Sequence, residues 1–230
     1  MSNLVSIIVP AFNEEQTITS ALTELLELDL PGFRKEIVVV NDGSLDRTRE
    51  RLEPFLDRVL YCEHEANRGK GASIRTGMMR SHGDFIAIQD ADLEYSSFSL
   101  RDLLTALQDD SELSAVYGSR NLGSSREGYA HYRLGAAFLT RCLNMLYGSS
   151  LTDVFTCQKI LRVNSLDASK LKSERFDIEM EITARLLGEG KCIREIPITY
   201  TARKFAHGKK IRTMDGIRSL VTLARCRFLG

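Results

Sequence analysis

Two carboxylates, Asp90 and Asp92, stand one residue apart, directly after an apolar run at residues 85–88 that predicts a buried strand. At the end of such a strand both side chains can face a single divalent cation, and hard oxygen ligands suit Mg²⁺ or Mn²⁺. Glu94 could add a third oxygen, and the ion would neutralise a diphosphate leaving group. An ordinary acidic loop is the simpler interpretation of the pair taken alone, because Asp-x-Asp is a common motif.

Two more polar segments follow predicted strands, at residues 10–15 and 41–44. Phe12 in the first could stack on a nucleobase, and Asp42 in the second could accept hydrogen bonds from a base or a ribose. Taken singly, residues 41–44 are more simply a turn and a helix cap, because Asn, Asp, Gly and Ser all favour turns. Their interest comes from their position, since ligand sites in α/β proteins collect at the carboxyl ends of strands.

Two groups of cations could bind phosphate. Residues 67–72 place Arg68 and Lys70 among glycines at a predicted helix start, a setting that suits anions. The segment matches neither a Walker loop nor a dinucleotide-binding fingerprint, and a solvated loop explains it equally well. The second group lies within residues 203–212 and could close over a diphosphate or an acceptor phosphate, although a charged surface loop is the usual interpretation. Its members are Arg203, Lys204, His207, Lys209, Lys210 and Arg212.

These segments lie between alternating strand-like and helix-like stretches. Strands are predicted at residues 4–9, 37–40, 85–88 and 114–117, and helical patterns at 18–26, after 46, after 69 and at 100–107. This β-α-β order favours an α/β fold, a mostly parallel sheet with flanking helices.

The second half of the chain is less regular. We expect a loop at 124–130, helices at 135–146 and 178–187, and a strand at 192–200, where Pro197 indicates a sheet edge or a bulge. No repeat or linker interrupts the chain, so we expect a single domain over residues 1–230.

Composition excludes several classes of protein. The chain has 43% hydrophobic and 27% charged residues, and its apolar runs are strand-length, so we expect no membrane-spanning helix. Thirty-one basic residues balance thirty-one acidic ones, which argues against a nucleic-acid partner. No secretion leader opens the sequence, and five scattered cysteines without a Cys-x-x-Cys pair indicate thiols in a reducing compartment. We therefore expect a cytoplasmic protein.

As a set, these segments resemble the family 2 glycosyltransferases, which have the GT-A fold. The resemblance runs in order from Val-Ser-Ile-Ile-Val-Pro-Ala-Phe-Asn-Glu-Glu through Val-Asn-Asp-Gly-Ser, Asn-Arg-Gly-Lys-Gly, Asp-Ala-Asp-Leu-Glu and Tyr-Gly-Ser-Arg to Glu-Ile-Pro-Ile-Thr-Tyr. Within the family the chain is most similar to the dolichol-phosphate-mannose synthase branch. That branch commonly has Leu-Gln after Asp-Ala-Asp, where this chain has Leu93 and Glu94.

The resemblance implies a donor site for a nucleotide sugar, either a UDP- or a GDP-sugar. Residues 1–120 would form the nucleotide-binding part. Pro10, Phe12 and Glu14 would line the base pocket with Asp42, and Ala91 would touch the donor.

The resemblance also implies the reacting centre. Asp90 and Asp92 would hold the metal, with Glu94 as the third ligand. Arg120 would lie near the sugar and the phosphates.

Residues 121–230 would form the acceptor-binding part with its basic loop and last helix. Arg203 and Lys209 would fold over the diphosphate, and Asp153 would lie on the sugar-binding side. The stretch after Asp153 is commonly Ser-Gly-Phe in the family, and here it is Thr156-Cys157-Gln158-Lys159.

The implied reaction is an inverting transfer of a hexose, with a polyprenyl or dolichyl phosphate as the first choice of acceptor. A phosphate acceptor needs no protein base, whereas a hydroxyl acceptor would need Asp153 or Asp92 in that role. A saccharide or other hydroxyl acceptor and an inactive nucleotide-sugar-binding module are the alternatives. A sugar-nucleotide pyrophosphorylase is disfavoured, because residues 10–15 contain neither glycine nor a cation.

The last segment predicts an amphipathic helix. Its apolar residues recur at helical spacing, and Arg218, Arg225 and Arg227 lie elsewhere on the helix. Such a helix can lie in a membrane interface, although a helix packed on the core is the commoner outcome. We hypothesise peripheral contact with a membrane to reach a lipid-phosphate acceptor. The apolar residues are Ile217, Leu220, Val221, Ala224 and Phe228.

Overall fold

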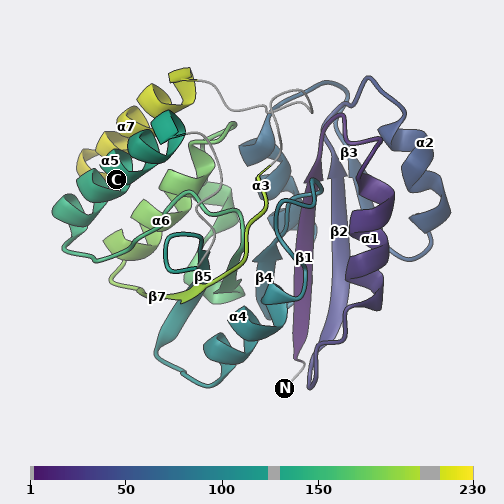
Figure 1. The fold of residues 1–230 in the computed structure, drawn as a ribbon, viewed down its shortest axis with the longest axis horizontal. Coiled ribbons are helices and arrows are strands. Elements are labelled where there is room, and N and C mark those ends of the chain that lie inside the picture. The colour runs from purple at the N-terminus through teal and green to yellow at the C-terminus, as the bar shows by residue number, and fades with distance from the viewer. Residues whose placement is uncertain (1–2, 124–129, 203–212, 230) are drawn as a thin grey trace.

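The fold is that of a computed structural model, which describes residues 3–123, 130–202 and 213–229 (Figure 1). The strands are β1 (Leu4–Ala11), β2 (Arg34–Asn41), β3 (Leu60–Glu63), β4 (Phe85–Ile88), β5 (Leu113–Ser119), β6 (Lys159–Arg162) and β7 (Cys192–Pro197). The helices are α1 (Ile18–Glu27), α2 (Thr48–Leu52), α3 (Lys70–Arg80), α4 (Ser99–Gln108), α5 (Ala130–Tyr147), α6 (Ile178–Gly188) and α7 (Thr213–Phe228), with short 3₁₀ turns at Glu53–Phe55, Val163–Ser165 and Ala168–Lys170.

One seven-stranded sheet joins both halves of the chain in the order β3-β2-β1-β4-β6-β5-β7. All neighbouring strands are parallel except β6, which runs antiparallel to both β4 and β5. The carboxyl ends of β1, β2 and β4 therefore meet at one edge of the sheet, where the polar segments that follow them come together.

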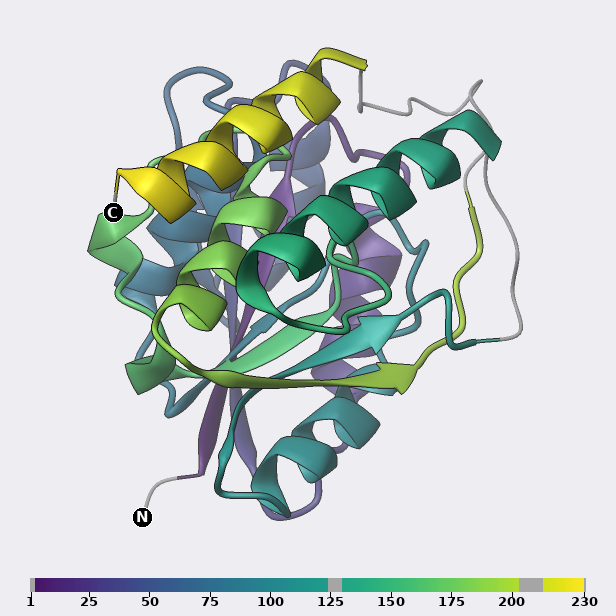
Figure 2. The same cartoon turned by 90° about the vertical axis from the view of Figure 1, so that its left-hand side faces the viewer.

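Alternate residues of the central strands pack on opposite faces of the sheet, which divides the core into layers. Ile7 of β1 packs with α1 and α4 on one face, and Ile8 packs with α3 and α6 on the other. A third cluster joins α6 to α5 and α7, with Leu143 and Leu223 among its buried members. Figure 2 shows α5 and α7 side by side as an outer layer over α6.

The expected α/β fold with a mostly parallel sheet is confirmed, and each predicted strand and helix in the described ranges has a counterpart. Pro197 ends β7, which is an edge strand as expected. Two strands were not predicted. β3 is a half-exposed strand at the opposite sheet edge, and β6 has only two apolar residues between Lys159 and Arg162.

The boundaries of several elements differ from those predicted from the sequence. α5 begins at Ala130, earlier than residue 135, and β7 ends at Pro197, with Tyr200 making only an isolated bridge to Tyr95. The predicted loop at 124–130 lies almost wholly outside the described residues. Within the described ranges, no helix combines the length and the apolar character that crossing a bilayer requires.

Candidate functional site

The carboxyl edge of the sheet brings the three predicted strand-end segments together. Ala11 pairs with Asn41 across β1 and β2, and Ile8 pairs with Ile88 across β1 and β4. Just beyond these pairs, the amide of Asp42 donates to the Ala11 carbonyl over 2.8 Å. The segments that begin at Pro10, Asp42 and Asp90 are therefore neighbours in space although they are far apart in sequence.

Two buried glutamines hold the acidic turn at residues 90–94 from beneath. Gln158 Nε2 donates to Gln89 Oε1 and to the Ser96 carbonyl, each over 2.7 Å, and Gln89 Nε2 donates to the Tyr95 carbonyl over 3.2 Å. Leu93 has a φ of 61°, a left-handed backbone conformation that residues other than glycine rarely adopt. The turn is thus fixed in a conformation that Leu93 would not adopt without support from its surroundings.

Asp90 is paired with Lys70, the first residue of α3. Lys70 Nζ lies 2.8 Å from Asp90 Oδ1 and 2.9 Å from Oδ2, and it also lies 3.3 Å from Glu179 Oε1. Burial alone lowers the pKa of Lys70, but the charges of Asp90 and of its other neighbours raise it well above the ordinary value. The predicted phosphate-binding cation is therefore at the site, and it serves there as an internal counter-ion.

Cys157 and Lys159 belong to the stretch that departs from the commoner family form. Cys157 Sγ lies 2.9 Å from Lys70 Nζ, and burial raises the pKa of the thiol well above its ordinary value. Lys159 is fully buried at the start of β6, where its ammonium contacts Glu179 and the carbonyls of Val154 and Thr156. Lys159 therefore faces the interior, and its chemistry is that of a buried ion pair beneath the acidic turn.

Asp92 and Glu94 turn toward different partners. Asp92 Oδ1 accepts a hydrogen bond of 3.1 Å from the Glu94 amide, and Glu94 Oε2 accepts one of 2.7 Å from the Tyr200 hydroxyl. In the part of the chain that the structure describes, no three His, Cys, Asp or Glu side chains gather as a ligand set for a metal ion. The expected three-carboxylate arrangement of Asp90, Asp92 and Glu94 is therefore not formed in this structure.

The donor set still fits a hard divalent cation. Mg²⁺ is commonly held by one or two carboxylates together with substrate phosphates and waters, without an all-protein cage. Asp92 is half-buried next to Asp90, so the turn offers carboxylate oxygens of the required chemistry.

Arg120 and Asp153 form a two-point ion pair at the end of β5. Arg120 Nε lies 2.7 Å from Asp153 Oδ2, Nη2 lies 2.7 Å from Oδ1, and the Arg120 amide adds a 3.0 Å bond to Oδ2. Glu195 of β7 fixes this loop in turn, because its carboxylate accepts from the amides of Thr152 and Asp153 over 2.7 Å each. Asp153, the candidate base, is thus paired with Arg120, the residue predicted to lie near the sugar and the phosphates.

Tyr200 connects the two halves of the site. Its hydroxyl donates to Glu94, and its ring lies 5.2 Å from the Arg120 guanidinium carbon and 5.1 Å from the Tyr95 ring. Tyr200 and Glu195 belong to a motif that the chain shares with the family, but the motif predicts a role for neither residue, and no sequence pattern points to Glu179. Each acts through an ion pair, ring contact or hydrogen bond to a residue distant in sequence, so a local pattern gives no signal for it.

Asp42 is engaged within the protein on all sides. Its carboxylate accepts from Asn67 Nδ2 and from the amides of Arg68 and Gly69 over 2.7 to 2.9 Å, and it lies 2.6 Å from His64 Nδ1. The group expected to bind a base or ribose therefore holds the loop that leads into α3.

The glycines of that loop serve packing. A Cβ at Gly69 or Gly71 would collide with the backbone carbonyls of Glu174 and Ser173, and Gly69 has a φ of 100°. The amide of Ala72, in the first turn of α3, donates to the Glu174 carbonyl over 3.2 Å. The glycines predicted to favour phosphate binding thus let the 173–175 segment approach the helix start.

The remaining predicted donor residues lie at the same edge. Glu14 is buried, its amide donates to Thr48 Oγ1 over 2.8 Å, and its carboxylate accepts from Thr17 over 2.8 Å. Pro10 and Phe12 are half-buried, and Ala91 is buried inside the acidic turn. Arg203 and Lys209 lie outside the described residues.

Comparison with known proteins gives a family and a fold. The model of the family described as "Glycosyl transferase family 2" matches residues 6–168. The chain is 34% identical over 134 residues to a dolichyl-phosphate beta-glucosyltransferase of Trichomonas vaginalis, a match that covers 53% of this chain and 41% of that protein. It is 26% identical to a dolichol-phosphate mannosyltransferase of Pyrococcus furiosus, over 89% of this chain and 58% of that protein.

The chain therefore spans less than two thirds of the length of either relative. Among solved structures, the chain is similar to a glucosyl-3-phosphoglycerate synthase of Mycobacterium tuberculosis in complex with Mn²⁺ and UDP-glucose. The TM-score is 0.76 at 18% identity, over 98% of this chain and 79% of that one. This likeness confirms the expected GT-A fold.

Proposed function

The chain belongs to glycosyl transferase family 2, and from this premise we propose that it transfers a hexose from a UDP- or GDP-sugar to a polyprenyl or dolichyl phosphate. The two relatives that use dolichyl phosphate support this choice of acceptor. Transfer would be a single inverting displacement, in which an acceptor phosphate oxygen attacks the anomeric carbon and the nucleoside diphosphate leaves.

The observation that carries the proposal is the link that Tyr200 makes between Glu94 and Arg120. The acidic turn supplies carboxylates for a cation, and Arg120 supplies a positive charge close by. The sugar and the diphosphate of the donor would lie between the acidic turn and Arg120, so that both the bound cation and the guanidinium could contact the negatively charged diphosphate. A diphosphate leaving group carries negative charge that a nearby guanidinium and a metal ion stabilise.

A divalent cation, when bound, would act as a Lewis acid that neutralises the leaving diphosphate. Asp92 is our first choice of ligand, with Asp90 beside it and Glu94 as the third candidate. Lys70 would keep Asp90 in place from the protein side, since it contacts both oxygens of that carboxylate.

The donor nucleoside would bind along the ends of β1 and β2. Phe12 offers a half-buried ring for stacking on the base, with Pro10 and Glu14 on the same segment. Asp42 would act there by holding the 64–69 loop, and Ala91 would touch the donor from the acidic turn. Arg203 and Lys209 remain predicted to fold over the diphosphate.

The surroundings of Asp153 favour a phosphate acceptor over a hydroxyl acceptor. A hydroxyl group must lose a proton to a base, whereas a phosphate is already anionic at neutral pH. Asp153, one of the two candidate bases, is buried, and both of its carboxylate oxygens accept hydrogen bonds from Arg120, so neither oxygen is turned toward an acceptor hydroxyl. We therefore assign Asp153 the task of orienting Arg120.

A donor and acceptor panel tests the proposal. UDP- and GDP-hexoses are each incubated with polyprenyl phosphate or with hydroxyl acceptors, with Mg²⁺, Mn²⁺ or a chelator present, and nucleoside diphosphate release is measured. We expect release that requires both the lipid phosphate and the metal ion. Release of nucleoside diphosphate with a hydroxyl acceptor but not with polyprenyl phosphate would show that the acceptor is a hydroxyl group. No release with any donor would favour an inactive binding module.

A further inference from the structure

Helix α7 has its apolar stripe on the outside. Ile217, Val221 and Phe228 are 55%, 63% and 72% exposed, whereas the polar residues Ser219 and Thr222 are 2% and 3% exposed. This is the reverse of the usual arrangement, in which an amphipathic helix turns its apolar stripe to the core.

The inward polar face of α7 is held by specific contacts. Thr222 Oγ1 donates to Asp177 Oδ2 over 2.8 Å, and Asp215 is buried with Arg175 Nε 3.4 Å away. Leu223 adds a buried apolar contact to α5 and α6. The orientation of the helix is therefore determined by its contacts, and the exposure of the apolar stripe follows from it.

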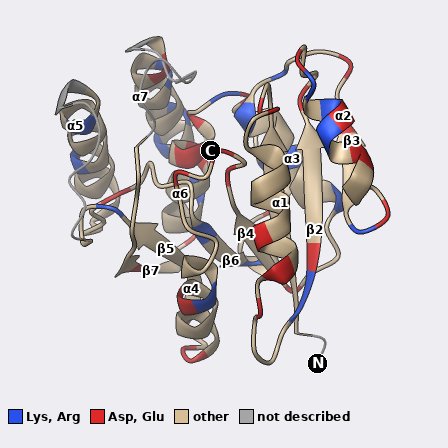
Figure 3. Cartoon of the chain, turned by 45° about the vertical axis from the view of Figure 1, so that its right-hand side comes forward, with Lys and Arg blue, Asp and Glu red and all other residues tan. Residues whose placement is uncertain are grey.

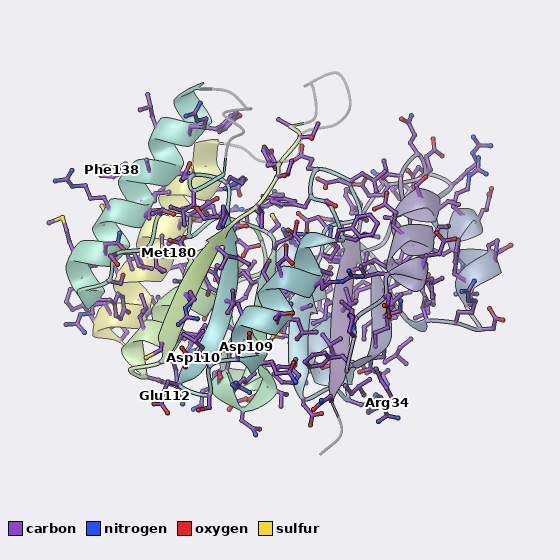
Figure 4. All side chains as sticks on the ribbon, turned by 60° about the horizontal axis from the view of Figure 1, so that its bottom comes forward. Arg34, Asp109, Asp110, Glu112, Phe138 and Met180 are labelled. Carbon is purple, nitrogen blue, oxygen red and sulfur yellow. The ribbon has the colours of Figure 1, made fainter. Side chains whose placement is uncertain are left out.

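Helix α5 exposes an apolar stripe of its own beside α7. Leu134, Phe138 and Met145 are exposed, and their spacing places them on one face, while Leu139 and Leu143 are buried beneath them. Figure 4 shows Phe138 on α5 at the outer side of the molecule, with Met180 of α6 further in.

The two helices form one surface. They contact each other, and Figure 2 shows that they lie side by side and run in the same direction. We name this the α5/α7 surface and define it by Leu134, Phe138, Met145, Ile217, Val221 and Phe228. Exposed apolar patches that continue over neighbouring elements mark interaction sites in proteins that otherwise bury such residues.

Among the described residues of α5 and α7, every exposed charged side chain is basic. Arg133 and Arg141 of α5 and Arg218 and Arg227 of α7 are exposed. The sequence of α5 contains no acidic residue, and the one acidic residue of α7, Asp215, is buried. Figure 3 shows basic but no acidic colour on α5. The chain as a whole has no net charge, so this local excess is specific to the two helices.

We propose that the α5/α7 surface binds the face of an anionic lipid bilayer. Its apolar side chains would enter the membrane interface, and the arginines around them would contact lipid headgroups. Amphipathic helices that lie in a membrane interface bind in this way. A second copy of the chain fits this surface less well, because a symmetric contact would bring arginines against arginines without exposed acidic partners on α5 and α7.

The direction of the helices relates the surface to the site. Both begin at the end of the molecule where the carboxyl ends of β5 and β7 lie (Figure 2). Arg120 follows β5 and Tyr200 follows β7, so the site and the α5/α7 surface share this end. The inference nevertheless rests on the two helices alone and holds whether or not the proposed transfer reaction is correct.

Vesicle flotation tests the inference without donor or acceptor. The purified chain is mixed with phosphatidylcholine vesicles that contain or lack phosphatidylglycerol, and the bound fraction is measured. We expect binding to the anionic vesicles that weakens with added salt. Binding should fall about tenfold or more in the double variant Ile217→Glu, Val221→Glu and in Phe138→Glu, because each places charge in the apolar stripe. Leu56→Glu, an equivalent change at an exposed apolar residue beyond α2, should bind like the wild type.

Two results would overturn the inference. One is a wild-type chain that stays unbound, or variants that float as well as it does. The other is a stable dimer by light scattering that Ile217→Glu, Val221→Glu converts to a monomer, which would assign the surface to a second copy. Unfolding curves that match the wild type would show that the variants remain folded, and all substituted side chains are exposed.

Discussion

The hydroxyl of Tyr200 donates a hydrogen bond of 2.7 Å to Glu94 Oε2, and the two residues come from opposite halves of the chain. Tyr200 also pairs with Tyr95 through an isolated bridge. This contact attaches the acidic turn to the segment after β7 and brings the turn close to Arg120. The shape of the site therefore depends on a residue with no ionisable role of its own.

Tyr200→Phe should keep the ring and lose this hydrogen bond. We expect kcat/KM to fall by roughly tenfold, since a bond to a charged group contributes about 1.5–3 kcal/mol and part of it is regained from water. Steady-state kinetics measure the change. Tyr147→Phe is the matched control, because the buried Tyr147 hydroxyl has no hydrogen-bond partner in the described structure. Equal rates in Tyr200→Phe and the wild type would remove Tyr200 from the site.

Asp153→Asn separates an orienting role from a base role. If Asp153 orients Arg120, the variant should lose about 2–4 kcal/mol of unfolding free energy and roughly tenfold or more in kcat/KM, because a buried ion pair is broken. The shape of the pH–rate profile should stay unchanged. Urea denaturation and a pH series of kcat/KM check both parts. Unaltered stability together with the loss of the acidic limb of the profile would show instead that Asp153 is the base.

Asp92→Ala should remove the main ligand of the proposed metal ion. We expect kcat to fall by roughly a thousandfold, since metal stabilisation of a leaving group is worth several kcal/mol. Calorimetric titration with Mn²⁺ in the presence of the nucleoside diphosphate should show the loss of metal binding directly. Asp57→Ala, at an exposed position between α2 and β3, serves as the control. Intact Mn²⁺ binding in Asp92→Ala would assign the metal to other residues.

Lys70→Met tests whether Lys70 binds the donor or serves as an internal counter-ion. The structure places its ammonium against Asp90 and Glu179, so the variant should lose about 3–5 kcal/mol of unfolding free energy, as for any buried pair that loses one partner. Chemical denaturation gives this value, and the donor KM gives the comparison. A raised donor KM with unchanged stability would restore the phosphate-binding role. Lys170→Met, at an exposed position, is a matched substitution.

Glu181 predicts how stability depends on pH. Its fully buried carboxylate accepts from the amides of Lys172 and Ser173 and from Arg185 Nε over 2.6 to 3.0 Å. Burial alone would raise its pKa, but these hydrogen bonds hold the pKa below the ordinary value of 4.5. The folded state thus binds the proton less tightly than the unfolded state. The resulting stability is present above pH 4.5 and is lost as the pH falls below it.

Glu181→Gln should therefore lower the unfolding free energy by about 1–3 kcal/mol at neutral pH and flatten its decline under acid. Urea unfolding at a series of pH values measures both effects. Glu189→Gln, an exposed change just after α6, should follow the wild-type curve. An identical decline in Glu181→Gln and the wild type would show that other carboxylates cause the acid sensitivity.

The sequence by itself determined the family, the α/β fold and the place of the acidic turn. Strand-length apolar runs followed by polar turns are local patterns, and parallel strands bring such turns to one edge whatever the details of packing. Pro10, Asp42 and Asp90 could therefore be located at one edge from the sequence. The sequence does not predict β6, because its two apolar residues, Ile160 and Leu161, lie between Lys159 and Arg162 and form too short a pattern to indicate a strand.

Only the tertiary structure decided what the charged groups contact. The sequence predicts that Lys70, Asp42 and Asp153 each face a ligand, yet each is paired with a residue far along the chain, because a buried charge needs a partner within the protein. The same holds for α7. Helical spacing predicts that an apolar stripe exists, but the contacts of Thr222 and Leu223 decide that it faces outward. The spacing of apolar residues shows which of them share one face of a helix, but only the packing of the helix decides which face is buried.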